Sequence, residues 1–404
     1  MRDSDPVSLL ADLVRRPSVN PMGRDVSGPQ YLEGRVGEYL VQRLAAAGIP
    51  WVRQHVAPGR DNVIARLEAT VADAPVILWD AHQDTVPAEG MSIEPFTPLV
   101  RDGRMYGRGT CDVKGGLAAM VAALERLAAS SERRATVVLA ATVNEEFGFS
   151  GARALTGLWM RGAPAPTDTD AAARSLVGSR PAVAIVAEPT GLDLVVAHKG
   201  SLKWRIRVHG RACHGAFPEQ GANALYAAAR AALAIEGLAG ELLARHPDHA
   251  CGPPTLSLGT LHGGTGVNLV PDLAVLEVER RLLPEESAAV ARAEVIERVA
   301  AACPGVRIEH EEPFNDAFGL ADGTADPGAT PWVEALARGA AAAGAGRRVA
   351  ARYGTNAGVY AAAGVPSVVF GPGSIAQAHT ADEWIDLGQL ADAAAVLAAV
   401  VAPV

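Results

Sequence analysis

Four short segments of the chain are apolar at almost every position and lack the alternation of a half-exposed strand. They are Pro75–Ala81, Thr136–Val143, Ala182–Ala187 and Val365–Phe370. Strands that are covered on both faces have this character, and they occur in parallel sheets flanked by helices. The pattern therefore predicts that these four segments are buried strands of one sheet.

Helical patterns lie before and between these strands. Ser4–Pro6 is typical of a helix start, with a capping side chain followed by proline, and apolar residues then recur on one face. Further helices are predicted from about 31 to 47 and from 115 to 129. Buried strands that alternate with helices predict an α/β domain with a mostly parallel sheet.

The middle of the chain has a different pattern. Leu202–His209 and Leu273–Arg280 alternate apolar and polar residues, as half-exposed strands do. The other elements predicted here are an Ala-rich helix at 223–238, a shorter one near 240, a helix after Pro284 and a strand at 305–310. We therefore predict a small α+β domain at 200–313, inserted into a catalytic domain made of 1–199 and 314–404.

Composition narrows the class of protein. Hydrophobic residues make up 49% of the 404 positions and charged residues 20%, which is typical of a chain that builds a core. The net charge is -9, from 36 Lys and Arg against 45 Asp and Glu. This acidic balance argues against a nucleic-acid partner, which would need a basic surface, and against an anionic membrane.

Cysteines and apolar stretches indicate a soluble cytoplasmic protein. The four cysteines at 111, 213, 251 and 303 include no C-x-x-C pair, so neither a disulfide framework nor a cysteine zinc site is predicted. Residues 1–6 contain two acids and none of the apolar run of a signal peptide. Glycine and proline interrupt the uncharged stretches 250–271 and 353–381, so we expect no membrane span.

Residues that can bind metal follow the predicted strands directly. The first strand runs into His82 and Asp84, and positions two apart in an extended chain point the same way. Taken alone, this pair is explained by an ordinary turn. Glycines crowd around Asp112 just before a predicted helix, where the acid either caps the helix or faces a metal.

The other strands end in the same manner. Glu145 and Glu146 follow the second strand and Glu188 follows the third, while His379 comes after the fourth strand and a glycine-rich loop. The carboxyl edge of such a sheet is where α/β proteins form their sites. We therefore expect these side chains, together with His82 and Asp112, near one edge.

Two histidines with several carboxylates suit zinc or a similar divalent ion. One carboxylate held between two ions, with a spare acid beside them, is the layout of a two-metal hydrolase. In that chemistry the metals lower the pKa of a bridging water, and the free carboxylate takes its proton and passes it to the leaving group.

The order of these residues resembles the M20 family of metallo-amidohydrolases, which includes acetylornithine deacetylase, succinyl-diaminopimelate desuccinylase, aminoacylase and glutamate carboxypeptidase. The resemblance spans nearly the whole chain. Its blocks are His82-x-Asp84-x-Val-Pro87, Gly107-Arg-Gly-x-x-Asp112-x-Lys-Gly115, Glu145-Glu146, Glu188-Pro-Thr190, Gly210-x-x-x-His214-x-x-x-Pro218 and Ala378-His379-x-x-x-Glu383.

The resemblance implies a set of metal ligands. Asp112 would bridge two zinc ions, His82 and Glu188 would complete one site, and Glu146 and His379 the other. Cobalt and manganese stay open as alternatives to zinc, because availability as well as affinity decides which ion is bound.

The resemblance also implies the other roles in the site. Glu145 would be the general base and acid, and Asp84 would orient His82. In the insertion, His214 resembles the histidine that stabilises the oxyanion, often across a dimer interface. Asn268 resembles a substrate-contacting asparagine, and Arg281 a carboxylate-binding arginine.

Several functions compete at this point. The first is a deacylase that hydrolyses the amide bond of an N-acyl amino acid; the second is a dipeptidase or carboxypeptidase of the same family. By the resemblance, Glu188 and Arg281 favour the deacylase or a carboxypeptidase. Desuccinylase relatives often carry an acid and an arginine in the segment that corresponds to Gly354–Gly358. Here Asn356 replaces the acid and there is no arginine, which favours a small acyl group such as acetyl over succinyl. A non-catalytic binding protein would be expected to lose ligands that this chain retains. Apolar faces in the insertion predict a homodimer.

Other motifs give little information about function. Gly371–Ala376 matches a relaxed dinucleotide-binding pattern but lacks the following βαβ unit, and Gly148–Gly151 is not the GxSxG of a serine hydrolase. Neighbouring Arg280 is expected to point to the face of its strand opposite Arg281. Lys114 and Lys199 stay open between a solvated and a structural role.

Overall fold

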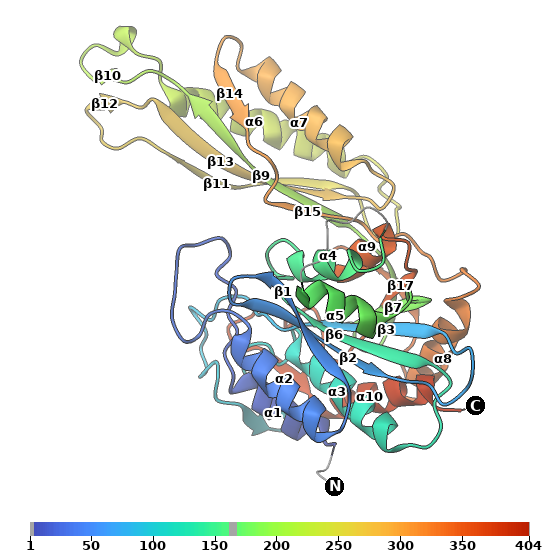
Figure 1. Cartoon of the computed structure of the whole chain (residues 1–404). Coiled ribbons are helices and arrows are strands. Elements are labelled where there is room, and N and C mark those ends of the chain that lie inside the picture. The colour runs from blue at the N-terminus through green and yellow to red at the C-terminus, as the bar shows by residue number, and fades with distance from the viewer. Residues whose placement is uncertain (1–3, 161–167, 404) are drawn as a thin grey trace. The chain divides into compact units, whose positions relative to one another are not determined.

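The four uninterrupted apolar segments lie side by side in the computed structural model, which describes residues 4–160 and 168–403 (Figure 1). They form β3 (Val76–His82), β6 (Thr136–Thr142), β7 (Val183–Val186) and β17 (Ser367–Val369). These strands are parallel neighbours in the order β6-β3-β7-β17, at the centre of an eight-stranded sheet. Their apolar character therefore reports burial on both faces.

A mostly parallel sheet was predicted, but the outer strands add antiparallel pairings, so the sheet is mixed. They are β1 (Trp51–Ala57) and β2 (Arg60–Leu67) at one edge and β8 (Leu194–His198) and β16 (Arg348–Ala351) at the other. β1 pairs antiparallel with β2, β2 with β6, and β8 with β17. The first two strands are joined by a turn at Pro58-Gly59. A connection this short can join only antiparallel strands, because parallel strands need a longer crossover.

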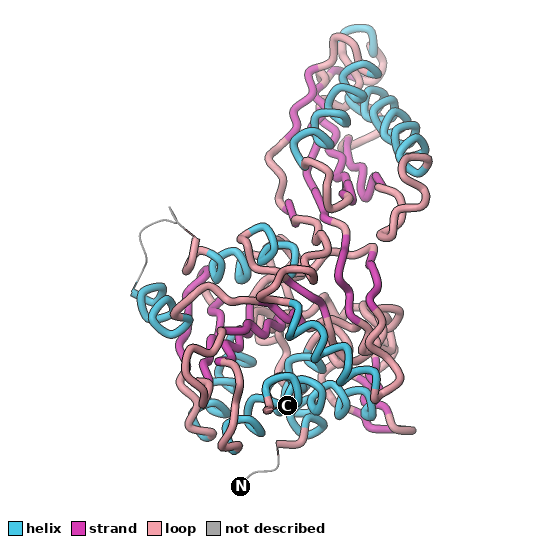
Figure 2. The backbone as a smooth tube through the Cα atoms, turned by 90° about the vertical axis from the view of Figure 1, so that its right-hand side faces the viewer, coloured by secondary structure: helices cyan, strands magenta, loops and turns pink. Residues whose placement is uncertain are grey.

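Two layers of helices cover this sheet (Figure 2). One layer contains α1 (Pro6–Val14), α2 (Gly34–Ala46), α3 (Lys114–Ala129), α8 (Thr330–Ala341) and α10 (Leu387–Val401). The other contains α4 (Ser150–Thr156), α5 (Asp168–Val177) and α9 (Asn356–Ala362). Successive strand residues point to opposite layers, so β3 sends Trp79 and Ala81 into the first core and leaves Asp80 and His82 facing the second side.

The predicted start of the first helix is confirmed in detail. The Asp5 carboxylate accepts hydrogen bonds from the backbone N–H groups of Val7 and Ser8, and Pro6 is the first helical residue. Lys114 has a structural role, because its buried ammonium donates to the carbonyl oxygens of Leu13 and Arg16 at the end of α1. This contact ties α1 to the start of α3.

A small sheet lies next to the segment that carries Asp112. It contains β4 (Leu99–Arg101), β5 (Arg104–Tyr106) and β18 (Trp384–Asp386), paired in the order β18-β5-β4. Because β18 comes shortly after His379 and β5 shortly before Asp112, this pairing joins two distant parts of the chain.

The chain divides into two compact units. The larger comprises the described parts of Met1–Val196, Asp322–Val349 and Thr355–Val404, and the smaller comprises Ala197–Ala321 with Ala350–Gly354. The smaller unit has an antiparallel sheet with β9 (Gly200–His209), β11 (Thr255–Gly263), β13 (Leu273–Leu282), β14 (Arg307–His310) and β15 (Asn315–Ala317). Its short pieces are β10 (Cys213–His214), the 3-10 turn Pro218–Gln220 and β12 (Leu269–Val270).

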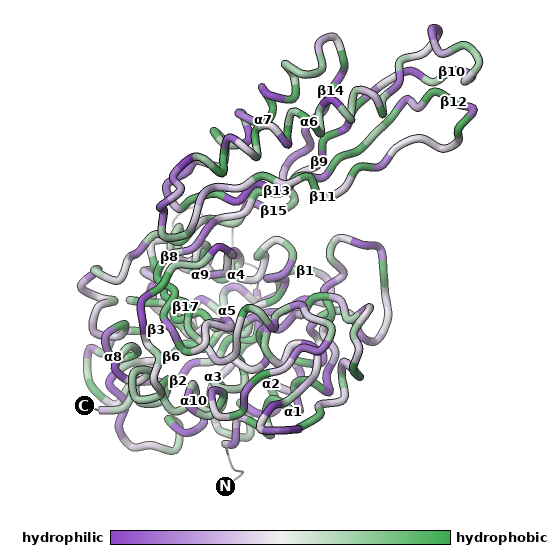
Figure 3. Tube along the Cα trace, turned by 180° about the vertical axis from the view of Figure 1, so that it is seen from behind, coloured by the Kyte–Doolittle hydropathy of each residue, from purple (hydrophilic) through white to green (hydrophobic). Residues whose placement is uncertain are grey.

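Helices α6 (Ala224–Leu243) and α7 (Ala288–Ala302) cover one face of the smaller unit's sheet. The alternation of apolar and polar residues along β9 and β13 can be followed in Figure 3, and it places the apolar side chains under these helices. The sequence predicted two helices in this region, but α6 is a single continuous helix. Its glycines at 237 and 240 cost about 1 kcal/mol each relative to alanine, and Leu238 and Leu242 remain packed in the core on either side of Gly240.

Although α6 is long, no helix among the described residues has both the length and the apolar character needed to cross a bilayer.

Candidate metal centre

The side chains that follow the central strands meet at one edge of the sheet. His82 is the last residue of β3, Glu145 and Glu146 begin the turn after β6, and Glu188 follows β7. His82, Glu145 and Glu188 each offer a ligand atom, and these atoms lie within 4.8 Å of one another. His82, Asp112 and Glu146 form a second group of the same size.

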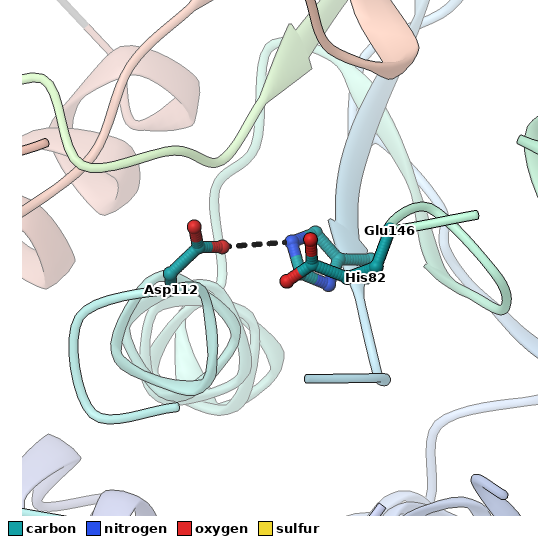
Figure 4. Close-up of side chains that lie close together, drawn as sticks. All are labelled: His82, Asp112 and Glu146. Atoms are coloured by element: carbon teal, nitrogen blue, oxygen red, sulfur yellow. Dashed lines mark hydrogen bonds and ion pairs between the residues drawn. The ribbon is translucent and has the colours of Figure 1, made fainter. Parts of the chain in front are cut away.

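Asp112 lies between two histidines. Its Oδ1 is 3.1 Å from His82 Nε2, and its Oδ2 is 3.3 Å from His379 Nε2. Figure 4 shows Asp112 and Glu146 directed at the ring of His82. His379 Nε2 is also 3.4 Å from Glu146 Oε2, and His82 Nε2 is 3.9 Å from Glu188 Oε1. The two oxygens of one carboxylate thus face two different ligand pairs.

Local backbone geometry makes these positions possible. Asn144, between β6 and the two acids, has φ of 61°, and His379 has φ of 62°. Left-handed backbone is uncommon for residues other than glycine and turns the chain sharply. At Asn144 the chain leaves the direction of β6 just before the two acids, and at His379 the left-handed residue itself carries a candidate ligand.

The cluster is strongly acidic and almost closed to solvent. Glu145 is 8% exposed, Glu188 5% and Asp112 7%, whereas the imidazole of His379 is half exposed. Burial, reinforced by repulsion from the neighbouring carboxylates, raises the pKa values of Glu145 and Glu188 well above the ordinary range. Burial also raises the pKa of Glu146.

The histidines are the cationic partners within this group. Hydrogen bonds with Asp112 and Glu146 raise the pKa of His379 to about 11. Burial opposes the charged form of His82, but Asp112 and the nearby glutamates raise its pKa well above the usual value. The Asp112 pKa moves the other way: burial would raise it, but the two histidines lower it.

These residues fit divalent cations. Within the described ranges, no lysine or arginine forms an ion pair with Asp112, Glu145, Glu146 or Glu188. One oxygen of Glu146 is buried with no hydrogen-bond partner. Buried carboxylates need a compensating charge, and imidazole with carboxylate is the ligand set of zinc and related ions. Asp112, Glu146, Glu188 and the two histidines would hold the ions.

Asp84 contacts His82 through its backbone carbonyl and uses its carboxylate elsewhere. His82 Nδ1 donates to the backbone carbonyl of Asp84 at 2.9 Å, and the nearest carboxylate oxygen is 3.7 Å away. The carboxylate instead accepts from the backbone N–H groups of Glu145 and Glu146 and from the amide of Asn20 at 2.7 Å. Asp84 therefore holds the ring through its main chain and the two acids through its side chain.

Sequence reasoning missed Asn20. Its side chain also donates to Asn144 Oδ1 at 3.0 Å, which fixes the turn that precedes the acids. The only local signal is Asn20-Pro21, a dipeptide that marks a turn and says nothing of a site.

Three predicted site residues belong to the smaller unit, whereas the proposed metal ligands all belong to the larger one. His214 pairs with Leu269 in the β10–β12 ladder, and the backbone N–H of the next residue, Gly215, donates to the carbonyl oxygen of Asn268 at 2.7 Å. Both side chains are exposed.

Arg281 and Arg280 point to opposite faces of β13, as expected. Arg280 is 1% exposed and is held by Glu286 and by the carbonyl of Arg281. Arg281 is 28% exposed and 2.8 Å from Glu279 on the polar face. Of the two, Arg281 is the one that a dissolved ligand can reach. Lys199 is also structural, since its ammonium is buried and donates to the Pro253 carbonyl.

The Asn356 side chain was expected to influence the acyl pocket. It lies instead in a buried hydrogen-bond network. Its amide donates to Asp80 Oδ2 at 2.9 Å and to Thr142 Oγ1 at 3.1 Å, and its exposure is 1%. Burial raises the pKa of Asp80 to about 6. The neutral Asn356 thus satisfies a buried acid and presents no surface to a pocket.

This contact predicts a pH-dependent loss of stability in the variant Asn356→Asp. Two buried carboxyls in contact would retain a proton that the unfolded chain releases near pH 4. The free energy of unfolding should therefore fall as pH rises, by about 3 kcal/mol at pH 8 and by less at pH 5. Urea unfolding at both pH values measures this, with Asn223→Asp, at a helix N-cap that accepts either residue, as the control. Equal losses at both pH values would contradict the buried pairing.

Comparison with known proteins agrees with this geometry. Residues 78–402 match the sequence profile of peptidase family M20/M25/M40. An acetylornithine deacetylase from Myxococcus xanthus is 30% identical over 375 residues, which cover 90% of each protein. A succinyl-diaminopimelate desuccinylase from Stenotrophomonas maltophilia is 33% identical over 304 residues, covering 72% of this chain and 71% of that protein.

The fold matches as well. An M20 family metallo-carboxypeptidase from Sulfolobus solfataricus superimposes with a TM-score of 0.75 over 98% of both chains, at 16% identity. The resemblance read from the six sequence blocks is confirmed by the profile and by the relatives. The chain therefore belongs to peptidase family M20/M25/M40 and is a hydrolase.

Proposed function

We propose that the protein hydrolyses the amide bond of N-acyl amino acids in the manner of a deacetylase, with two divalent metal ions, for which we propose zinc. The observation that carries the proposal is the position of Asp112, whose oxygens face His82 on one side and His379 on the other. A carboxylate between two ligand pairs is what a two-metal centre requires.

Glu145 is the residue proposed to move the proton. It is grouped with His82 and Glu188, and it lacks the contact with His379 that Glu146 makes. Bound metal ions would supply a water of lowered pKa and polarise the substrate carbonyl. The Glu145 carboxylate would accept the proton of that water and pass it to the leaving nitrogen. Its burial, which raises its pKa, suits a group that must hold a proton during turnover.

His214 is proposed to donate a hydrogen bond to the oxyanion. The backbone N–H of Ala216 donates to His214 Nδ1 at 3.1 Å. In a neutral imidazole whose Nδ1 accepts a hydrogen bond, the proton lies on Nε2. The exposed ring therefore presents a donor, as stabilisation of a developing negative charge requires.

The substrate class is proposed from the arginine on β13. Arg281 is partly exposed, and its guanidinium can hold a free carboxylate by two hydrogen bonds. Its only anionic partner among the described residues is Glu279, which Lys203 also contacts at 3.4 Å. Asn268, beside His214, would contact the same substrate. An amino acid with a free carboxylate and an acylated nitrogen meets these demands, and the deacetylase and desuccinylase relatives agree with this class.

A hydrolysis screen tests the proposal. Protein loaded with zinc or cobalt would be given N-acetyl, N-succinyl and N-formyl amino acids and dipeptides, alongside chelated protein. We expect metal-dependent release from N-acetyl amino acids, at a higher kcat/KM than from N-succinyl compounds, because residues 354–358 include no arginine and several relatives are acetylornithine deacetylases. Activity on N-succinyl but not N-acetyl substrates would contradict the acyl preference.

The second candidate is a dipeptidase or carboxypeptidase. A carboxypeptidase also needs an arginine for the substrate carboxylate, so Arg281 fits this alternative equally well. Release from dipeptides alone in the same screen would select it. Full metal occupancy without turnover of any compound would instead favour a non-catalytic binding protein.

We also propose a homodimer formed through the smaller unit. β11 is an edge strand, bonded on one side only to β13, and unpaired edges invite another strand. Tyr226 and Leu233 on α6 are 71% and 66% exposed. Light scattering should give twice the mass of one chain. Leu233→Asp should shift the protein towards monomer, whereas Val71→Asp, at an exposed apolar residue of the larger unit, should not. A monomeric wild-type protein would overturn the proposal.

A further inference from the structure

Glu383 is a buried carboxylate whose hydrogen-bonding capacity is completely used. It is 0% exposed. Its Oε1 accepts from the backbone N–H groups of Cys111 and Asp112, at 2.8 and 3.0 Å. Its Oε2 accepts from the Gly109 N–H at 2.9 Å and from the Arg108 guanidinium at 2.8 Å. With two donors on each oxygen, Glu383 has no oxygen left to bind a metal ion.

All four donors belong to the segment that ends at Asp112. The Glu383 backbone carbonyl accepts a fifth hydrogen bond from Gly107, at 3.0 Å. Gly109 has φ of +81°, which lets three backbone N–H groups turn towards one carboxylate. A Cβ at Gly115 would lie 2.5 Å from Ile385, so the start of α3, just after Asp112, also packs closely against the chain that follows Glu383.

Glu383 is also linked by sequence to the other side of the centre. It follows His379 by four residues, and the next residue begins β18, which pairs with β5. The Glu383 side chain therefore joins the segment that carries His379 to the segment that carries Asp112, in addition to the β5–β18 pairing.

We propose that Glu383 is the positioning residue that sets Asp112 between its two ligand pairs. The proposal rests on the metal centre proposed above and adds a residue that acts on metal binding without touching metal or substrate. Hydrogen bonds to a charged carboxylate are about twice as strong as neutral ones, and the N–H of Asp112 itself is one of the donors. A shift of this segment moves the carboxylate that both ions share.

The variant Glu383→Gln tests this directly. Glutamine has the same shape, but its NH₂ group must face N–H donors where an oxygen now accepts them. Cobalt titration, followed by the visible absorption of the bound ion, measures affinity without any assay of activity. We expect affinity to fall by about 10–100-fold, the loss typical of removing an outer partner of a metal ligand. The absorption bands of the bound cobalt should also change.

The matched control is Glu125→Gln. Glu125 is a largely buried carboxylate of α3, which Arg43 holds at 2.6 and 2.9 Å, and none of its printed contacts among the described residues is with the Asp112 segment. It should lower stability while leaving cobalt affinity and spectrum as in the wild type. Glu383→Asp, which keeps the charge but is shorter by one methylene, should give an intermediate loss. If Glu383→Gln fails to fold, the cobalt affinity of Glu383→Asp tests the positioning role of Glu383 instead.

The outcomes separate the two claims. If wild-type protein binds cobalt and Glu383→Asp or a folded Glu383→Gln binds it equally well with the same spectrum, the positioning role of Glu383 is wrong. The role is also wrong if Glu125→Gln loses affinity to the same extent, because the effect is then general destabilisation. If the wild-type protein binds no cobalt, the proposed metal centre itself fails.

Discussion

Replacing Glu145 with glutamine is expected to lower kcat by about 10²–10⁴-fold, the usual contribution of a general base. Metal content should stay at the wild-type level. Glu145 makes no ion pair with either histidine within 4.0 Å among the described residues, and its backbone N–H, which Asp84 holds, is unchanged in the variant. Steady-state kinetics on the best substrate, with metal analysis of the same sample, measures both quantities.

The neighbouring acid provides the contrast. Glu146→Gln changes the same functional group one residue away, but Glu146 lies 3.4 Å from His379 and within the ligand group of Asp112. It should lose metal first and activity as a consequence, so that added metal restores part of the rate. If Glu145→Gln retains more than a tenth of the wild-type kcat, Glu145 is not the base.

Replacing Asp112 with asparagine is expected to reduce bound metal from two ions per chain to at most one and to abolish turnover. The amide keeps one oxygen but turns an NH₂ group towards either His82 or His379, so at least one ligand set loses its shared oxygen. Both sets lose the negative charge. The affinity loss should exceed the roughly 100-fold upper range for an outer partner. Metal analysis after dialysis against a fixed free zinc concentration measures it.

His379→Gln tests whether Asp112 is shared. His379 contacts only one side of Asp112, with Glu146, so this variant should lose one ion and keep the other. If Asp112→Asn retains one ion with the same affinity as the ion that His379→Gln retains, Asp112 serves a single ion.

The parts of the fold that the sequence predicted are those where burial alone decides the residue type. The central strands could be found because both faces are covered, and the acids at their ends follow from strand direction. β1 and β2 were missed, since their polar positions break the apolar run. The division of α6 at Gly240 was wrong, because packing outweighs the cost of an interior glycine.

The clustering of the proposed ligands was partly predictable, but the contacts that hold them were less so. His82, the glutamate pair and Glu188 follow parallel strands to one sheet edge, whereas Asp112 and His379 reach it from loops. By contrast, Asp84 holds His82 through its backbone carbonyl and holds the glutamates through amides. Such contacts depend on turn geometry at residues such as Asn144, which leaves no periodic signal in the sequence.

The most direct test of the two-metal centre is anomalous diffraction from crystals of zinc-loaded protein. We expect two peaks per chain, one on each side of the Asp112 carboxylate. His82 and Glu188 should ligate one ion, and Glu146 and His379 the other. A single peak under saturating zinc, or two peaks that do not share Asp112, would contradict it.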